Sequence, residues 1–317
     1  MVALLKNCLA TNLNKKKNKD TRKRVFILHF LSLGGGIFAD FAVFYWQCGV
    51  PSKKFCRFAI ENDYVMDRLL EICAGDIASV IAAAEGGAAR VELCSALAVG
   101  GVTPSEGFVS RAVAVPGIRK NVLVRPREGD FVYSPEEVEI MLSDVNMAAR
   151  CGADGVVVGA LLPDGSIDTD TCLRLADAAR SHGLSLTFHR AFDRVADAFG
   201  SLECIIAMGF DRVLTSGLAP TALEGAAMLR RLNDVAAGRI IILAGCGVNS
   251  RNAAEIARLS GCRELHASAR SAQPSAMTFS RCEVAMGSSD SDTRLTTDVA
   301  EVRDIVAALA ARSHKCK

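Results

Sequence analysis

Short apolar runs alternate with amphipathic segments from residue 69 onward. The runs are rich in β-branched residues and have the length of buried strands. They begin 20 to 34 residues apart, a spacing that fits one strand, one helix and two short loops. The pattern therefore predicts parallel strands joined by helical crossovers, over Leu69–Ala74, Ala89–Cys94, Asn121–Pro126, Gly155–Leu161, Ser185–Arg190, Arg212–Gly217, Ile240–Gly245 and Glu264–Ala269.

The segments between these runs carry the start and stop signals of helices. The clearest helix is Ser134–Gly152, in which Ser134 is the N-cap, Pro135 the first helical residue and Glu137 the partner in a capping box. Gly152 supplies the stop, because glycine tolerates the left-handed conformation that ends many helices. The same signals predict helices over Asp76–Gly87, Asp170–Gly183, Ala198–Gly209, Thr221–Gly238 and Ser250–Gly261, and then a loop and a final helix near Asp298–Arg312.

Eight strands separated by helices predict a TIM-type (β/α)8 barrel of parallel strands in the α/β class. Such a barrel needs about 250 residues, so a chain of 317 residues has room for a barrel and an extension. An open doubly wound sheet is the alternative fold, and it predicts a G-x-G-x-x-G loop after an early strand. No such loop follows the early strands of this sequence. We assign residues 66–317 to the barrel and residues 1–65 to a non-barrel extension.

The N-terminal extension has a composition of its own. Residues 1–68 contain twelve Lys and Arg against five Asp and Glu, and residues 25–50 are nearly uncharged. A basic region before an apolar span is typical of a membrane anchor or an organelle-targeting leader. Asp40 and the run Gly34–Gly36 interrupt the span, which favours a disordered extension or a wrongly assigned start of translation. Met66, directly before the first strand, would be a natural start.

Composition and charge narrow the class of protein. Half of the residues are apolar and 23% are charged, as in soluble globular proteins. Residues 69–317 are net acidic, which excludes an electrostatic nucleic-acid surface and gives the barrel no reason to bind a membrane. The twelve cysteines include no Cys-x-x-Cys pair, so a zinc ribbon is excluded. Reduced thiols in the cytosol are expected, most of them small buried hydrophobes like Cys151, Cys172, Cys204 and Cys262.

The first two strands repeat one motif, Leu-Glu-Ile-Cys and Val-Glu-Leu-Cys. Side chains alternate along a strand, so the apolar residues should face the helices. The four others, Glu71, Cys73, Glu92 and Cys94, should point into the barrel. A buried carboxylate is costly unless it is paired. The predicted partners follow the third strand: Arg125 and Arg127, and after them Asp130.

Polar side chains also gather at the ends of the later strands, where TIM barrels place their functional residues. A lattice of ion pairs that only fills the barrel is the structural alternative, but so many titratable groups more often mark a functional site. The residues concerned are His189, Arg190 and Asp193 after the fifth strand, Thr215, Ser216 and Gly217 after the sixth, Gly245, Cys246 and Gly247 after the seventh, and His266 and Ser268 on the eighth.

Read together, these motifs resemble the CutC copper-homeostasis family over residues 69–287. The sequence Thr-Phe-His-Arg-Ala-Phe-Asp is the most specific of them. In chain order the matching motifs are Leu70–Cys73, Arg90–Cys94, Gly100–Ser105, Arg125–Arg127 with Gly129–Phe131, Thr187–Asp193, Leu214–Gly217 and Met286–Gly287.

The resemblance implies a cytoplasmic TIM barrel that assembles as a homodimer or homotetramer. It also implies binding of the copper ion Cu(I), and the strand-end cysteines proposed as its ligands in the family match Cys73 and Cys94. Two positions depart from the family pattern. Glu128 stands where glycine is usual and adds a negative charge at the mouth of the barrel, and Cys246 adds a third thiol among residues that are usually small.

Two hypotheses about function follow from the residues. Cu(I) is soft and prefers thiolates. The first hypothesis is a copper site in which Cys73 and Cys94 share one ion. Neighbouring strands lie about 4.8 Å apart, which allows one ion to bridge the two sulfurs. Inward residues of adjacent strands fall in alternate layers, so the two sulfurs need not be level. Arg125 or Arg127 would lower the pKa of the thiols, and Glu71 and Glu92 would oppose this. His189 or His266 would complete the ligand set.

The alternative is an enzyme acting on a small anionic metabolite. Copper binding should depend on the two cysteines and be indifferent to Arg125 and His189, whereas catalysis should show the reverse dependence. The acid–base candidates are Glu71, Glu92, His189 and Asp193, and the anion-binding candidates are Arg125, Arg127, Asp130, Arg190, Thr215, Ser216, Gly217 and His266.

Overall fold

The computed structural model describes residues 68–279 and 293–310, and these residues form a closed barrel of eight parallel strands. The TIM-type fold predicted from the sequence is confirmed. The observed strands are shorter than the predicted runs at several ends. They are β1 (Leu69–Ala74), β2 (Arg90–Leu93), β3 (Arg119–Leu123), β4 (Gly155–Val158), β5 (Ser185–Phe188), β6 (Arg212–Thr215), β7 (Ile241–Gly245) and β8 (Glu264–Ala267).

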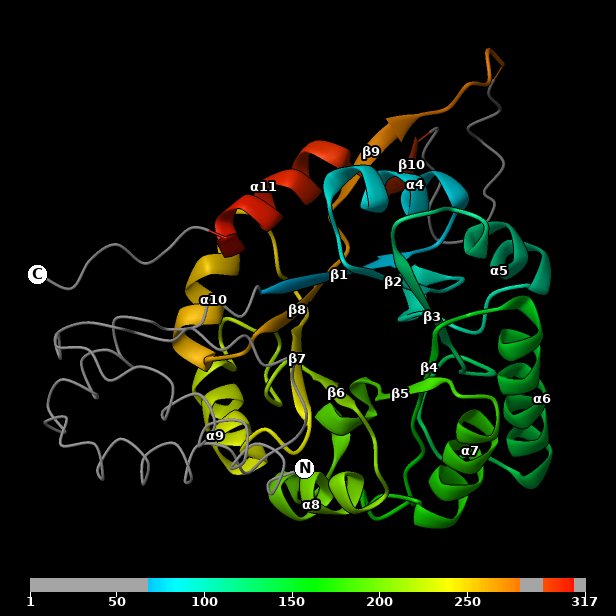
Figure 1. Ribbon diagram of the computed structural model, residues 1–317, viewed down its shortest axis with the longest axis vertical. Coiled ribbons are helices and arrows are strands. Elements are labelled where there is room, and N and C mark those ends of the chain that lie inside the picture. The colour runs from blue at the N-terminus through cyan, green and yellow to red at the C-terminus, as the bar shows by residue number, and fades with distance from the viewer. Residues whose placement is uncertain (1–67, 280–292, 311–317) are drawn as a thin grey trace, which may run out of the picture. The chain divides into compact units, whose positions relative to one another are not determined.

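Helices surround the strands (Figure 1). They are α4 (Ile77–Gly86), α5 (Glu106–Val113), α6 (Pro135–Cys151), α7 (Thr169–Ser181), α8 (Ala198–Ala207), α9 (Ala226–Ala236), α10 (Ala253–Ser260) and α11 (Val299–Ala310), with short 3-10 helices η1 (Leu97–Val99) and η2 (Arg190–Arg194). Helix α6 has the predicted capping box between Ser134 and Glu137 and ends at Gly152 in the left-handed conformation. Helix α5 was not predicted. It has only eight residues, which gives the helical period little length in which to show.

Alternation along the strands places charged residues inside the barrel. On β1, Leu70 and Ile72 are buried in the apolar core. The intervening Glu71 instead bonds Arg90 of β2 and His266 of β8 inside the barrel. Cys73 aligns with Glu92 across the β1–β2 pair, so Cys94 lies two residues further toward the C-terminal end. The cysteines therefore occupy successive layers, as the geometry of such barrels predicts.

A two-stranded antiparallel ribbon follows the barrel where the sequence predicted only a loop. It pairs β9 (Arg270–Pro274) with β10 (Thr293–Thr297) and extends outward from the ring of helices (Figure 1). Most of its side chains are exposed, so it lacks the apolar run that identifies a buried strand. Its base is fixed to α4, because the backbone N–H of Thr297 donates to Ser79 Oγ.

Helix α11 closes the ring by packing against α4. The contact is close because Gly86 has no side chain. A Cβ at that position would lie 2.3 Å from Cγ1 of Val302, a fully buried residue of α11. The final helix was predicted near Asp298–Arg312, and its observed bounds agree with that prediction.

Candidate functional site in the barrel interior

A buried ion-pair network crosses the barrel interior; we define it as Glu71, Arg90, Arg212, Glu264 and His266. The Arg90 guanidinium pairs with both carboxylates, and its contact with Glu264 is 2.7 Å. Arg212 pairs with the same Glu264 at 3.0 Å. Paired charges of this kind avoid the large penalty of an isolated buried ion.

The predicted partners of the inward carboxylates were wrong. Arg125 donates to backbone carbonyls of Val99, Gly101 and Gly129, and Arg127 pairs with Asp130 and Glu137 near the surface. Both arginines follow β3, and their side chains are held by the loops there. The true partner, Arg90, begins β2, and it shares a face with Glu92 because the two residues are two positions apart.

His266 links the network to Glu92. Its Nδ1 lies 2.8 Å from Glu71 Oε1 and its Nε2 lies 3.7 Å from Glu92 Oε2. Burial alone would lower the pKa of His266, but Cys73, Glu71 and Glu92 together raise that pKa well above its usual range. The structure therefore places His266 in a buried, charged network.

The pKa values of the two inward glutamates shift in opposite directions. Burial opposes ionisation of Glu71, but the charge of Arg90 and the hydrogen bond from His266 lower its pKa to about 2. Burial raises the pKa of Glu92, and the negative charge of Glu71 adds to this effect, although His266 opposes it. Of the two, Glu92 is thus the better proton carrier, and Glu71 serves as a fixed negative charge.

The two strand-end cysteines share a small cluster, which we call the thiol cluster: Cys73, Cys94, Leu97, Leu123 and Val157. Cys94 is buried and its Sγ lies 3.4 Å from Glu92 Oε2. Burial, then the charges of Glu92 and Cys73, raise the pKa of the Cys94 thiol well above 9. The lowering of the thiol pKa that was expected from Arg125 or Arg127 is not found for Cys94. The guanidinium groups of both arginines are held by loop carbonyls and surface carboxylates.

His189 follows β5 and is buried on the opposite side of the barrel from β1. Its Nδ1 accepts a hydrogen bond from the backbone N–H of Ala191 at 3.2 Å. Its ring lies 4.9 Å from the Phe131 ring, centre to centre. Burial lowers the pKa of His189 to about 3, and the positive charge of Arg125 contributes. His189 is therefore a neutral imidazole at physiological pH.

Asp193 organises the loop after β6, together with other predicted site residues that contact it. Oδ1 of Asp193 accepts from Thr215 Oγ1 at 2.5 Å and from the backbone N–H groups of Ser216 and Leu218. Its Oδ2 pairs with Arg190 at 2.7 Å. Asp193 has its acceptor capacity largely filled by this loop, and it holds the backbone around Gly217 in place.

Gly159, which follows β4, makes room for His189. A Cβ at this position would lie 2.7 Å from both Cε1 and Nδ1 of the His189 ring. Gly159→Ala should therefore displace the ring and lower the free energy of unfolding by about 1–3 kcal/mol, as overpacking in a core does. Urea denaturation of the full chain measures this change.

Gly107→Ala is the matched control. A Cβ at Gly107 would meet nothing within 4 Å, and the residue lies in helix α5, where alanine is favoured over glycine by up to about 1 kcal/mol. This variant should be as stable as the parent or more stable. Equal destabilisation by the two substitutions would show that the His189 ring is not what makes Gly159 necessary.

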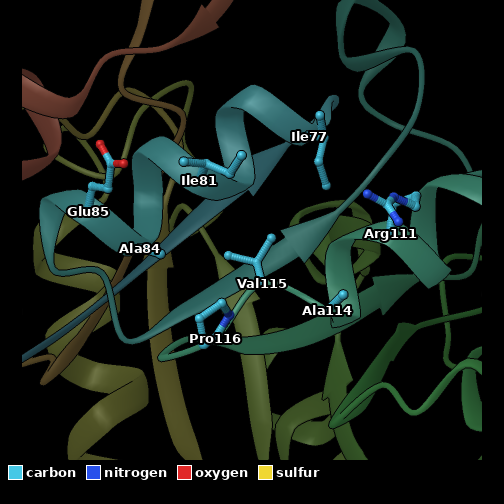
Figure 2. A pocket seen from close by; sticks show the side chains of 8 residues that line it. All are labelled: Ile77, Ile81, Ala84, Glu85, Arg111, Ala114, Val115 and Pro116. Atoms are coloured by element: carbon cyan, nitrogen blue, oxygen red, sulfur yellow. The ribbon is translucent and has the colours of Figure 1, made fainter.

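A surface pocket lies away from these residues, between α4 and the segment after α5 (Figure 2). None of its lining residues is a predicted site residue. They are Ile77, Ile81, Ala84, Glu85, Arg111, Ala114, Val115 and Pro116.

Among residues 68–279 and 293–310, no group of three or more His, Cys, Asp or Glu side chains is arranged to hold a metal ion. In the same ranges no helix is long and apolar enough to cross a membrane.

Comparison with known proteins gives the family. The model of the CutC family matches residues 68–271. The copper homeostasis protein cutC homolog of Mus musculus is 45% identical over 243 residues, which cover 75% of this chain and 88% of the mouse protein. A family protein CutC of Bacteroides fragilis is 47% identical over 243 residues and is covered to 96%.

A solved structure agrees with these matches. CutC from Streptococcus agalactiae superimposes with a TM-score of 0.60 at 35% identity, over 63% of this chain and 98% of that protein. Residues 68–271, which the family model matches, include all eight strands of the barrel and every residue of the ion-pair network and the thiol cluster. The chain therefore belongs to the CutC family.

Proposed function

We propose that this protein serves copper homeostasis by binding Cu(I) through Cys73 and Cys94. The observation that carries the proposal is the thiol cluster, in which two cysteines from adjacent strands share one small apolar environment inside the barrel. Soft thiolates select Cu(I) over the hard cations that prefer oxygen ligands. The homeostatic role comes from the names of the relatives.

The charges around the thiols suit a copper thiolate. Two thiolates and one Cu(I) carry a net charge of −1. In the network beneath them, Arg90 and Arg212 are balanced by Glu71 and Glu264. Protonated His266 is left beside Glu92, whose pKa is raised by burial. Cys73 lies close enough to His266 to help raise its pKa. This imidazolium would offset the extra negative charge of the bound complex.

A competition titration with Cu(I) under anaerobic conditions tests the proposal. The full chain should bind copper tightly, and the Cys73→Ser/Cys94→Ser double variant should lose that binding. The matched control is Cys151→Ser/Cys204→Ser, which removes two partly buried thiols of α6 and α8 outside the thiol cluster. Its copper affinity should equal that of the parent. Equal binding by all three proteins, or binding by none, would contradict the assignment.

A further inference from the structure

Three buried hydrogen-bond donors gather near the C-terminal ends of β3 and β5 without an acceptor. They are Nε of Arg125, the hydroxyl of Tyr133 and Nε2 of His189. Buried polar atoms are normally hydrogen-bonded, so an orphaned donor indicates a missing partner. Three such donors in one place indicate an acceptor that comes from outside the chain.

Arg125 brings an uncompensated charge to this place. Its two terminal nitrogens donate to backbone carbonyls, and no carboxylate of residues 68–279 or 293–310 lies within ion-pair distance of it. The nearby Asp130 is paired with Arg127 instead. A buried cation is costly unless an anion accompanies it. The site thus carries one positive charge, and the guanidinium group lies close enough to the Tyr133 hydroxyl to oppose the rise of its pKa.

The proton of His189 is fixed by its neighbour. Because Nδ1 accepts the backbone N–H of Ala191, the single proton of the neutral ring is on Nε2. Nε2 is therefore a neutral donor without an acceptor. The phenol of Tyr133 remains a donor too, because burial raises its pKa to about 12, although Arg125 opposes this.

Phe131 connects Arg125 and His189. The Arg125 guanidinium lies 4.9 Å above the centre of its ring, and the His189 ring lies 4.9 Å from the same centre. Phe131 and Tyr133 are only partly buried, whereas the three donor atoms are buried. The ring adds an apolar surface beside the three donors, as in sites that orient a small organic ligand with few polar groups.

We propose that Arg125, Tyr133 and His189 bind one oxygen of a small monocarboxylate. A carboxylate supplies both the missing acceptor and the missing negative charge. Arg125 cannot offer a bidentate fork, because both of its terminal nitrogens are occupied, so the ligand meets the guanidinium group through one oxygen at Nε. A single negative charge matches the single positive charge of Arg125, whereas the second charge of a phosphate would remain buried and unpaired. The site is separate from the thiol cluster, so the proposal does not depend on copper.

Imidazole NMR of the full chain tests the site, with acetate as the probe. The sequence has five histidines, so the Nε2 resonance of His189 can be identified with a His189→Gln variant. Acetate should shift this resonance saturably, and phosphate at equal ionic strength should bind at least about tenfold more weakly, because its second negative charge would be buried without a partner. Sodium chloride should produce no shift. His182, which bonds Asn146 on the outer helices, is the internal control and should not respond.

Two variants sharpen the result. Tyr133→Phe removes one donor and keeps the ring, and it should weaken acetate binding about threefold to tenfold. Cys73→Ser/Cys94→Ser should leave acetate binding unchanged, which separates this proposal from the copper site. A shift equal to that of chloride, no saturable shift, or an unchanged affinity in Tyr133→Phe would overturn the proposal. The donors would then be satisfied by buried water.

Discussion

Replacing Arg90 by methionine should lower the free energy of unfolding by about 3–5 kcal/mol, the penalty for breaking a buried ion pair from one side. Arg90 contacts both Glu71 and Glu264, and all three side chains are at most 7% exposed. Methionine fills much of the space of the arginine stem but leaves two buried carboxylates short of a counter-charge. His266 still contacts Glu71, and Arg212 still contacts Glu264. Each carboxylate therefore keeps one partner, and the barrel should still fold.

Urea denaturation followed by far-ultraviolet circular dichroism measures the change, because the midpoint shifts with stability at constant slope. The control is Arg239→Met. Arg239 forms a two-pronged pair with Glu203, and both side chains are about half exposed, so solvent screens the interaction and no resolvable change is expected. A loss of similar size in both variants would show that burial does not govern the contribution of Arg90.

The barrel could be predicted from the sequence because its signals are local. Strand length, helix caps and the spacing of apolar runs depend on neighbouring residues, and the inward direction of Glu71 and Cys73 follows from simple alternation. The partner of Glu71 depends on the stagger between strands. Arg90 could still have been found, because it shares the inward face of its strand with Glu92.

The arginines after β3 show where local reasoning ends. Arg125 and Arg127 were predicted to enter the barrel because they stand at a strand end in the sequence. The direction of a long side chain in a loop is decided by the acceptors that the loops bring to it. For Arg125 these are the carbonyls of Gly101 and Gly129, whose positions no spacing rule gives. Phe131 and Tyr133 were missed as site residues for the same reason.

The extension at residues 1–65, the location and the assembly of the chain stay at the level of sequence prediction. The predicted extension, whether disordered, targeting or wrongly assigned, lies outside the described residues. The cytoplasmic location and the homodimer or homotetramer stay predictions. The residues of the ion-pair network and the thiol cluster all come from the barrel strands and the loops beside them.

Copper affinity should rise at least about tenfold for each pH unit between pH 6 and pH 8, or at least about a hundredfold over the whole range, because thiolate ligands must lose their protons to bind metal. Burial and the charge of Glu92 raise the pKa of the Cys94 thiol well above 9. Cys94 is therefore protonated throughout this range, and each bound Cu(I) must displace at least its proton. A higher pH removes competing protons and so tightens binding.

Competition titrations of the full chain at pH 6, 7 and 8 measure this slope, after correction for the proton release of the competing chelator. Cys151→Ser/Cys204→Ser should show the parental slope, because these thiols lie outside the thiol cluster. Glu92→Gln removes a neighbouring negative charge that raises the pKa of Cys94, so binding at pH 6 should become tighter relative to the parent. An affinity independent of pH would mean that copper is held by ligands other than a buried thiol, and the assignment to Cys94 would fail.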